Sequence, residues 1–176
     1  MRPLNAYRAR LAGQARGFVP DFDPLDGGVG ARLLFLLEKP GPKTFPPAGS
    51  GFVSRDNADP TAMHCRAAMI QAGIPREGTL IWNIAPWWNE TVRTTGAEMR
   101  AGAVELAFLL AMLPALRGVV QVGNNAAAYG GPVAVATGLP LFRSVHPSNQ
   151  ARIGPASREA WTRIPDIWGS AWRAVA

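Results

Sequence analysis

The sequence predicts an α/β fold, a three-layer α/β/α sandwich around a central four-stranded parallel sheet. Four short apolar segments, bounded by Gly, Pro or polar residues, have the length and composition of strands buried on both faces. Segments with helical start and stop signals alternate with them, as in parallel sheets joined by helical crossovers. The chain has 176 residues, of which 48% are hydrophobic and 17% are charged. This composition suits a single domain over residues 1–176 with one buried core.

The first expected strand, Arg32–Glu38, contains five apolar residues in succession, and Pro40 and Gly41 follow it. Its last residue, Glu38, is an acid that is costly to remove from water. In open α/β sheets the ligand binds in the crevice outside the carboxyl ends of the strands. Glu38 is therefore a candidate active-site residue. Taken alone, it is better explained as a carboxylate in water where the strand ends.

The other three expected strands also end in polar residues. They are Thr79–Ile84, which contains Asn83, Leu116–Val122, which leads into Gly123 and Asn124, and Leu139–Val145, which leads into His146. The carboxyl ends of parallel strands lie at one edge of the sheet, so we expect Glu38, Asn83 and His146 to share one crevice. Taken singly, the asparagine has an alternative role in bonding its own turn, and the histidine in bonding a neighbouring carbonyl.

Helices are expected between and around these strands. Residues 2–16 are expected to form a basic helix or arm, and Asp59 and Pro60 begin a helix that Gly73 ends. Thr95 and Glu98 form a capping box for a helix that Pro114 ends. An alanine-rich helix follows Asn125, and the C-terminal segment is helical with a break at Pro165. Residues 17–30 are expected to form a loop. A long Pro-rich loop follows Glu38 and contains Phe52, a candidate for ligand contact or for covering the core.

The formal net charge of +6 favours a polyanionic partner, because a basic face gains affinity by releasing phosphate counterions. Arginine makes up most of this charge, and the chain has only two lysines, Lys39 and Lys43. Both lysines lie in the loop after Glu38, where we expect them to contact phosphates as point charges.

Cys65 is the only cysteine, so the chain has no internal disulfide and no all-cysteine metal or iron–sulfur site of its own. The sequence has no apolar span of 18 residues, and its basic first residues are not followed by an apolar signal core. We therefore expect a monomer in a bacterial-type cytosol or nucleoid, without a membrane partner.

In the order of its motifs, the chain resembles the uracil-DNA glycosylase superfamily over nearly its whole length. The matching motifs are Leu37-Glu38-Lys39-Pro40-Gly41 after the first strand, Phe52 in the following loop, Leu80-Ile81-Trp82-Asn83 in the second strand, Gly123-Asn124 after the third, and His146-Pro147-Ser148 after the fourth. The resemblance implies a DNA glycosylase of base excision repair. Such an enzyme flips uracil, or a related deaminated base, out of DNA and hydrolyses its N-glycosidic bond, without a metal or organic cofactor.

The resemblance also implies a role for each matching residue. Glu38 handles the attacking water, Phe52 stacks on the flipped base, Asn83 reads the edge of the base, His146 bonds its carbonyl, and Gly123, Asn124 and Ser148 grip phosphates.

Three departures from the family pattern concern the same motifs. Leu37 stands in place of a motif glycine, Asn149 and Gln150 stand where the family often has an apolar wedge, and Gly41 lies near the position of a tyrosine that excludes thymine. The four cysteines of the cluster-bearing branch are absent. Two further functions stay open: a catalytically weak or silent nucleic-acid-binding protein of the same fold, and a hydrolase of small nucleotides.

Overall fold

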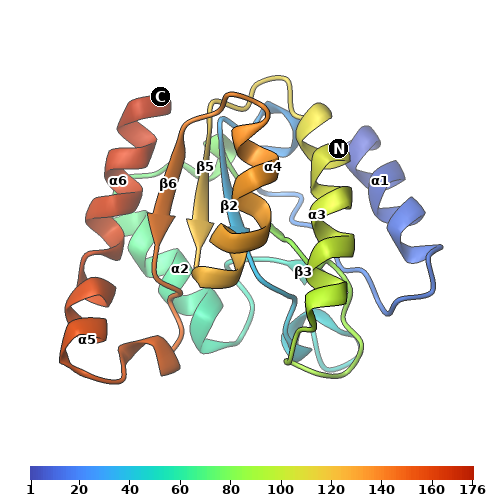
Figure 1. Ribbon diagram of the computed structural model, residues 1–176, viewed down its shortest axis with the longest axis horizontal. Helices are drawn as coiled ribbons and strands as arrows, with labels where there is room; N and C mark the ends of the chain where they lie inside the picture. The colour runs from blue at the N-terminus through green and yellow to red at the C-terminus, as the bar shows by residue number, and fades with distance from the viewer.

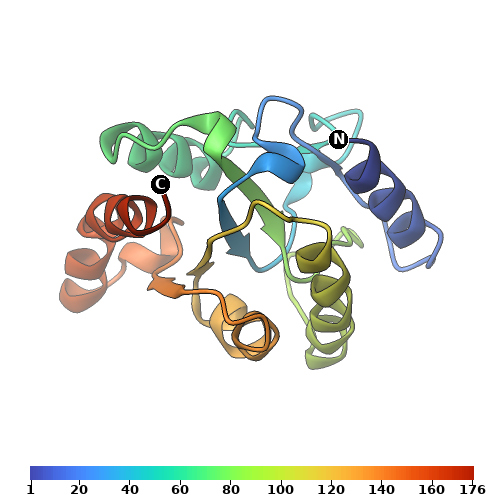
Figure 2. The ribbon, with the colours of Figure 1, turned by 90° about the horizontal axis from the view of Figure 1, so that it is seen from above.

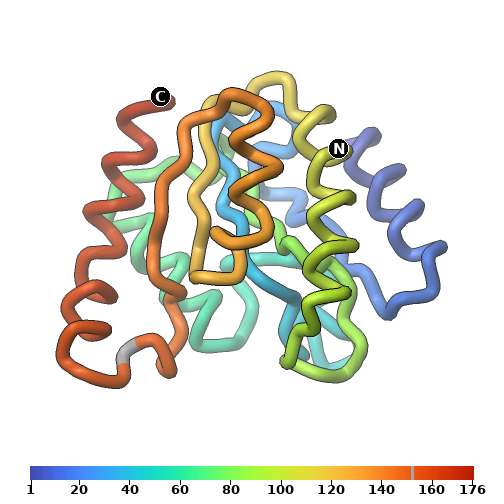
Figure 3. Tube along the Cα trace, in the orientation of Figure 1, coloured from blue at the N-terminus to red at the C-terminus, as the bar shows by residue number. Residues whose placement is uncertain are grey.

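A computed structural model describes residues 1–151 and 153–176 (Figure 3). It has a four-stranded, all-parallel sheet with the strand order β4-β2-β5-β6. The strands are β2 (Leu33–Leu37), β4 (Thr79–Asn83), β5 (Gly118–Val122) and β6 (Leu141–Ser144). Each lies within one of the four segments that the sequence predicts, so the α/β fold with a four-stranded parallel sheet is confirmed.

Helices cover both faces of this sheet. They are α1 (Arg2–Ala12), α2 (Pro60–Gln71), α3 (Gly96–Ala111), α4 (Gly131–Val135), α5 (Pro155–Thr162) and α6 (Ile164–Val175). Seen from above, α2 and α6 lie on one side of the strands and α3 and α4 on the other, with α1 beside α3 (Figure 2). The two helical layers and the sheet between them form the expected sandwich.

The helices α2 and α3 begin at the capping residues that the sequence predicts. The Asp59 side chain accepts a hydrogen bond of 3.0 Å from the Ala62 amide and so caps α2. Thr95 and Glu98 cap each other's backbone amides at the start of α3, which confirms the capping box. The C-terminal helical segment is interrupted at Arg163, two residues before Pro165.

One local expectation was wrong. The region 17–30, expected to be a loop, contains the short strand β1 (Asp21–Phe22), which pairs in parallel with β3 (Phe52–Val53) in a second small sheet. The pairing partner is distant in sequence, so no local pattern marks these strands. The expected alanine-rich helix is present, and it contains a π-helical stretch, Ala126–Gly130, before α4.

Aromatic and aliphatic side chains fill the core around the strands. All five residues of β2 are buried, and Phe22 stacks on Trp82 of β4 with ring centroids 3.7 Å apart. This stack attaches the small sheet to the large one. Among the described residues, no helix is long and apolar enough to cross a bilayer.

The connections define where a ligand site is expected. From the central strand β2 the chain crosses by α2 to β4, and then returns by α3 to β5 on the other side of β2. Such a reversal opens a crevice at the carboxyl ends of the strands. In Figure 1 the arrowheads of β5 and β6 point to the edge of the sheet where α5 lies.

Candidate active site

A cavity of about 320 Å³ lies at the carboxyl edge of the sheet. Its walls come from the loop after β2, the segment between β3 and α2, and the first turn of α2. Four of the nine predicted site residues line it: Lys39, Lys43, Asn83 and His146. The expected crevice between the ends of different strands is therefore present, with residues from β2, from β4 and from the loop after β6 around it.

Asn83 is the last residue of β4 and only 4% exposed. Its backbone is held by the pairing of β4 with Leu37 of β2, which directs the side chain into the cavity. Among the described residues, no group hydrogen-bonds to the Asn83 amide. The amide borders the cavity and is not among the fully buried polar groups that lack a partner, so this side chain has both a donor and an acceptor left for a ligand.

His146 follows β6 and lies in the wall of the same cavity. Burial lowers the pKa of its imidazole below the usual value of 6.5, while the negative charges of Glu38 and Asp59 oppose this effect. The imidazole is consequently neutral at pH 7. A neutral imidazole offers one N–H donor without a positive charge.

Glu38 directly follows β2, and its side chain is half-buried. The Thr94 hydroxyl donates a hydrogen bond to one carboxylate oxygen of Glu38. Glu38 does not line the cavity, but its chain neighbours Leu37 and Lys39 do, and its negative charge opposes the lowering of the His146 pKa. The structure thus brings the carboxylate, the imidazole and the Asn83 amide to the same edge of the sheet.

The two lysines differ in their surroundings. The Lys39 ammonium lies 2.6 Å from Oδ1 of Asn89 and 2.9 Å from Oε1 of Glu98, and its side chain is 3% exposed. These contacts leave little of the ammonium for a phosphate. Lys43, in contrast, is exposed at the cavity rim.

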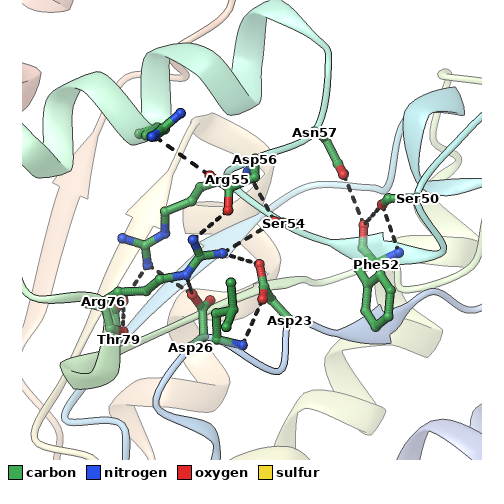
Figure 4. A network of polar contacts seen from close by, with 12 residues as sticks. Asp23, Asp26, Ser50, Phe52, Ser54, Arg55, Asp56, Asn57, Arg76 and Thr79 are labelled. Carbon is green, nitrogen blue, oxygen red and sulfur yellow. Dashed lines mark hydrogen bonds and ion pairs between the residues drawn. The ribbon is translucent and has the colours of Figure 1, made fainter.

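Phe52 lies in β3 and does not line the cavity, whereas the next residue, Val53, does. Its backbone carbonyl accepts a hydrogen bond of 3.0 Å from the amide of Asn57, which does line the cavity. Figure 4 shows the Phe52 ring pointing away from Asn57. The ring is half-buried outside the cavity wall, so the structure does not bring it together with Asn83.

The predicted phosphate-binding residues of the later motifs lie near a second hollow of about 430 Å³. Gly123, Asn124 and His146 line it together with residues of α5. Gly123 has a positive φ of 90°, and a Cβ there would lie 3.4 Å from Cβ of His146. Glycine therefore permits the turn after β5, while a Cβ there would meet His146 at an ordinary van der Waals distance. Ser148 is half-buried, and its hydroxyl lies 3.4 Å from the Ala151 amide.

A buried polar network beside the cavity escaped the sequence reasoning. Arg55, which lines the cavity, pairs with Asp26 at 3.2 Å and donates a bond of 2.5 Å to the Thr79 hydroxyl (Figure 4). Burial raises the pKa of Asp26 to about 6 and lowers that of Arg55. Arg76 bonds both Asp26 and Asp23. An Asp-rich loop and separated arginines carry no spacing signal, so only the fold brings these charges together.

The fold and this cavity define a class: a parallel α/β protein with a polar site at the carboxyl ends of its strands. Comparison with known protein families finds no family model that matches the sequence, and comparison with curated proteins finds no matching relative.

Proposed function

We propose that the protein is a uracil-DNA glycosylase-like hydrolase, which extrudes uracil or a related deaminated base from DNA and hydrolyses its N-glycosidic bond. The observation that carries this proposal is the buried Asn83 amide, which faces the cavity without a partner. A base inside a duplex is unreachable, and an enzyme that acts on it needs a pocket into which the base is flipped.

The Asn83 amide matches the edge of uracil, because its NH₂ group donates to a carbonyl and its oxygen accepts from a ring N–H. A base with a different order of donors and acceptors would leave the amide unpaired in a buried position. A site built to hydrogen-bond its substrate rejects such an analogue strongly. The cavity thereby supplies a physical basis for selecting uracil over cytosine.

The neutral His146 and the charged Glu38 suit the two ends of the bond that breaks. Departure of the base leaves negative charge on the base and positive charge on the sugar, and donors and carboxylates placed in advance stabilise these charges. His146 donates its N–H to the carbonyl of the leaving base. Glu38 faces the cationic sugar and orients the attacking water, with Thr94 holding one of its oxygens.

Phosphate contacts hold the strand while the base is extruded. Lys43 is the exposed lysine at the cavity rim, and Gly123, Asn124 and Ser148 lie in the two loops beside His146. The net charge of +6 supports a DNA partner through counterion release.

The test uses a labelled oligonucleotide with a single uracil, incubated with the protein and then treated with alkali. Release of the base leaves an alkali-labile site, so we expect a single cleavage product at the uracil and none with cytosine at the same position, because cytosine presents a different order of donors and acceptors to Asn83. The reaction is run with and without EDTA, and equal product is expected in both. Absence of cleavage in single- and double-stranded substrates containing uracil or other deaminated bases would contradict the proposal.

The second candidate is a catalytically silent nucleic-acid-binding protein of the same fold. The position of Phe52 favours it, because the ring does not line the cavity beside Asn83. In that case DNA binding is weak, salt-sensitive and indifferent to uracil, since it comes from phosphate contacts alone. Binding measured on matched uracil and cytosine oligonucleotides at two salt concentrations separates the two candidates.

A further inference from the structure

We infer that His64, on α2, is a positioning residue that holds the segment carrying His146 against the candidate active site. The inference concerns the geometry of His146, and its consequence for catalysis rests on the proposed function. It starts from a contact between distant parts of the chain: Nδ1 of His64 lies 2.8 Å from the backbone carbonyl oxygen of Pro147, 83 positions later.

The chemistry of this contact fixes the direction of the hydrogen bond. A carbonyl oxygen only accepts, so Nδ1 of His64 carries the hydrogen and donates it. Pro147 is buried, and its carbonyl would lose this partner if the imidazole were removed. An unsatisfied buried carbonyl is costly enough for the segment to shift toward another donor.

The ring of His64 is itself held in place from a second side. It meets the ring of Trp161 in α5 edge-to-face, with centroids 5.0 Å apart and an interplanar angle of 90°. A small cavity of about 240 Å³ lies beside these two rings and Pro147. His64 therefore connects α2 and α5 to the segment that follows β6.

A displacement of Pro147 is transmitted to His146 by the covalent chain. Proline has a fixed φ and confines the preceding residue to extended conformations, so the two residues move as a stiff unit. On its other side the His146 side chain borders Gly123 and the hollow of about 430 Å³, so a shift of Pro147 can move the imidazole. Loss of the His64 bond is thus expected to move the imidazole relative to Asn83.

Three variants separate the hydrogen bond from the packing of the ring. His64→Leu keeps an apolar contact with Trp161 but removes the donor. His64→Asn restores a donor, because its amide nitrogen is attached to Cγ as Nδ1 is. Gln71→Leu is the matched control, since Gln71 lies on the same helix and lines the same small cavity without bonding Pro147.

The first readout is independent of catalysis. The chain has two histidines, so imidazole NMR signals of His146 are identified directly by comparison with the His64 variants. We expect His64→Leu to shift these signals and the apparent pKa of His146, and His64→Asn and Gln71→Leu to leave both close to the native values. Unchanged His146 signals in folded His64→Leu would overturn the inference.

The second readout is uracil excision under single-turnover conditions. Because a misplacement of about 1 Å costs on the order of a hundredfold in rate, His64→Leu is expected to lose about tenfold to a hundredfold, mainly in the chemical step. His64→Asn is expected to recover most of this loss with unchanged DNA affinity. Equal losses in both His64 variants, at equal melting temperature, would overturn the positioning role. If the native protein releases no uracil, the proposed function fails, and the NMR comparison still decides the role of His64.

Discussion

Lys39 and Glu98, 59 positions apart in the chain, form an ion pair of 2.9 Å at the edge of the candidate active site. The same ammonium lies 2.6 Å from Oδ1 of Asn89 and 3.3 Å from the Arg93 carbonyl oxygen. These bonds tie the segment between β4 and α3 onto the loop after β2. The motif lysine therefore joins two loops around the cavity, where its sequence position predicts a phosphate contact.

This arrangement predicts different effects for the two lysines. Lys39→Met should lower the free energy of unfolding by about 1–3 kcal/mol, because Glu98 and two neighbouring acceptors lose a largely buried partner. It should leave the dependence of DNA binding on salt unchanged. Lys43→Met should leave stability unchanged and reduce the slope of log K against log salt by about 1. Urea unfolding and binding titrations at several salt concentrations make the comparison. A reduced slope of log K against log salt for Lys39→Met would show that Lys39 contacts a phosphate.

The candidate catalytic carboxylate gives the second prediction. Glu38→Gln keeps the size of the side chain and its bond with Thr94 but removes the charge that would stabilise the sugar cation. We expect turnover of a uracil substrate to fall by about two or more orders of magnitude, with little change in DNA affinity. Glu77→Gln, an exposed carboxylate that does not line the cavity, is the control. Undiminished base release by Glu38→Gln would show that this carboxylate is not the catalytic one.

The third prediction concerns base recognition by Asn83. In Asn83→Asp a carboxylate replaces the amide, so the side chain accepts but no longer donates at neutral pH. Uracil excision should weaken, and excision of cytosine should become detectable, since the exocyclic amine of cytosine is a donor. Asn5→Asp, on the exposed face of α1, is the control for the added charge. Parallel assays on uracil and cytosine oligonucleotides measure the change. Native selectivity in Asn83→Asp would place the base-binding pocket elsewhere.

The fourth prediction concerns stability as a function of pH. Burial lowers the pKa of His146 below its unfolded value of 6.5. Just below pH 6.5 the unfolded chain therefore binds a proton that the native state does not, and stability falls as the pH is lowered. His146→Asn removes this group, so its free energy of unfolding should change less between pH 7.5 and 5.5 than that of the native protein. Urea unfolding at both pH values gives the difference, in which contributions from other groups such as Asp26 cancel. Equal changes in the two proteins would show that His146 is not held neutral by burial.

Much of the fold was predictable because its signals are local. The five apolar residues of β2 are readable as a doubly buried strand, and the Asp59 and Thr95 caps mark helix starts within three residues of chain. Parallel strands place their carboxyl ends at one edge, so the proximity of Asn83 and His146 followed from the order of the elements. These features depend on periodicity, capping and chain direction, which the sequence contains directly.

The tertiary structure alone decided which side chains are free and which are already bonded. Lys39 and Lys43 are four residues apart in one loop, yet Lys39 is buried against Glu98 and Lys43 is exposed. Phe52 pairs in a small sheet with a residue whose segment looked like a loop, and its ring lies outside the cavity. The ion-pair partner of Lys39 and the strand that pairs with Phe52 come from distant parts of the chain, and such contacts depend on distances of a few ångströms. A sequence pattern determines the edge of the sheet at which polar groups gather, but only the packed fold determines which of them meet.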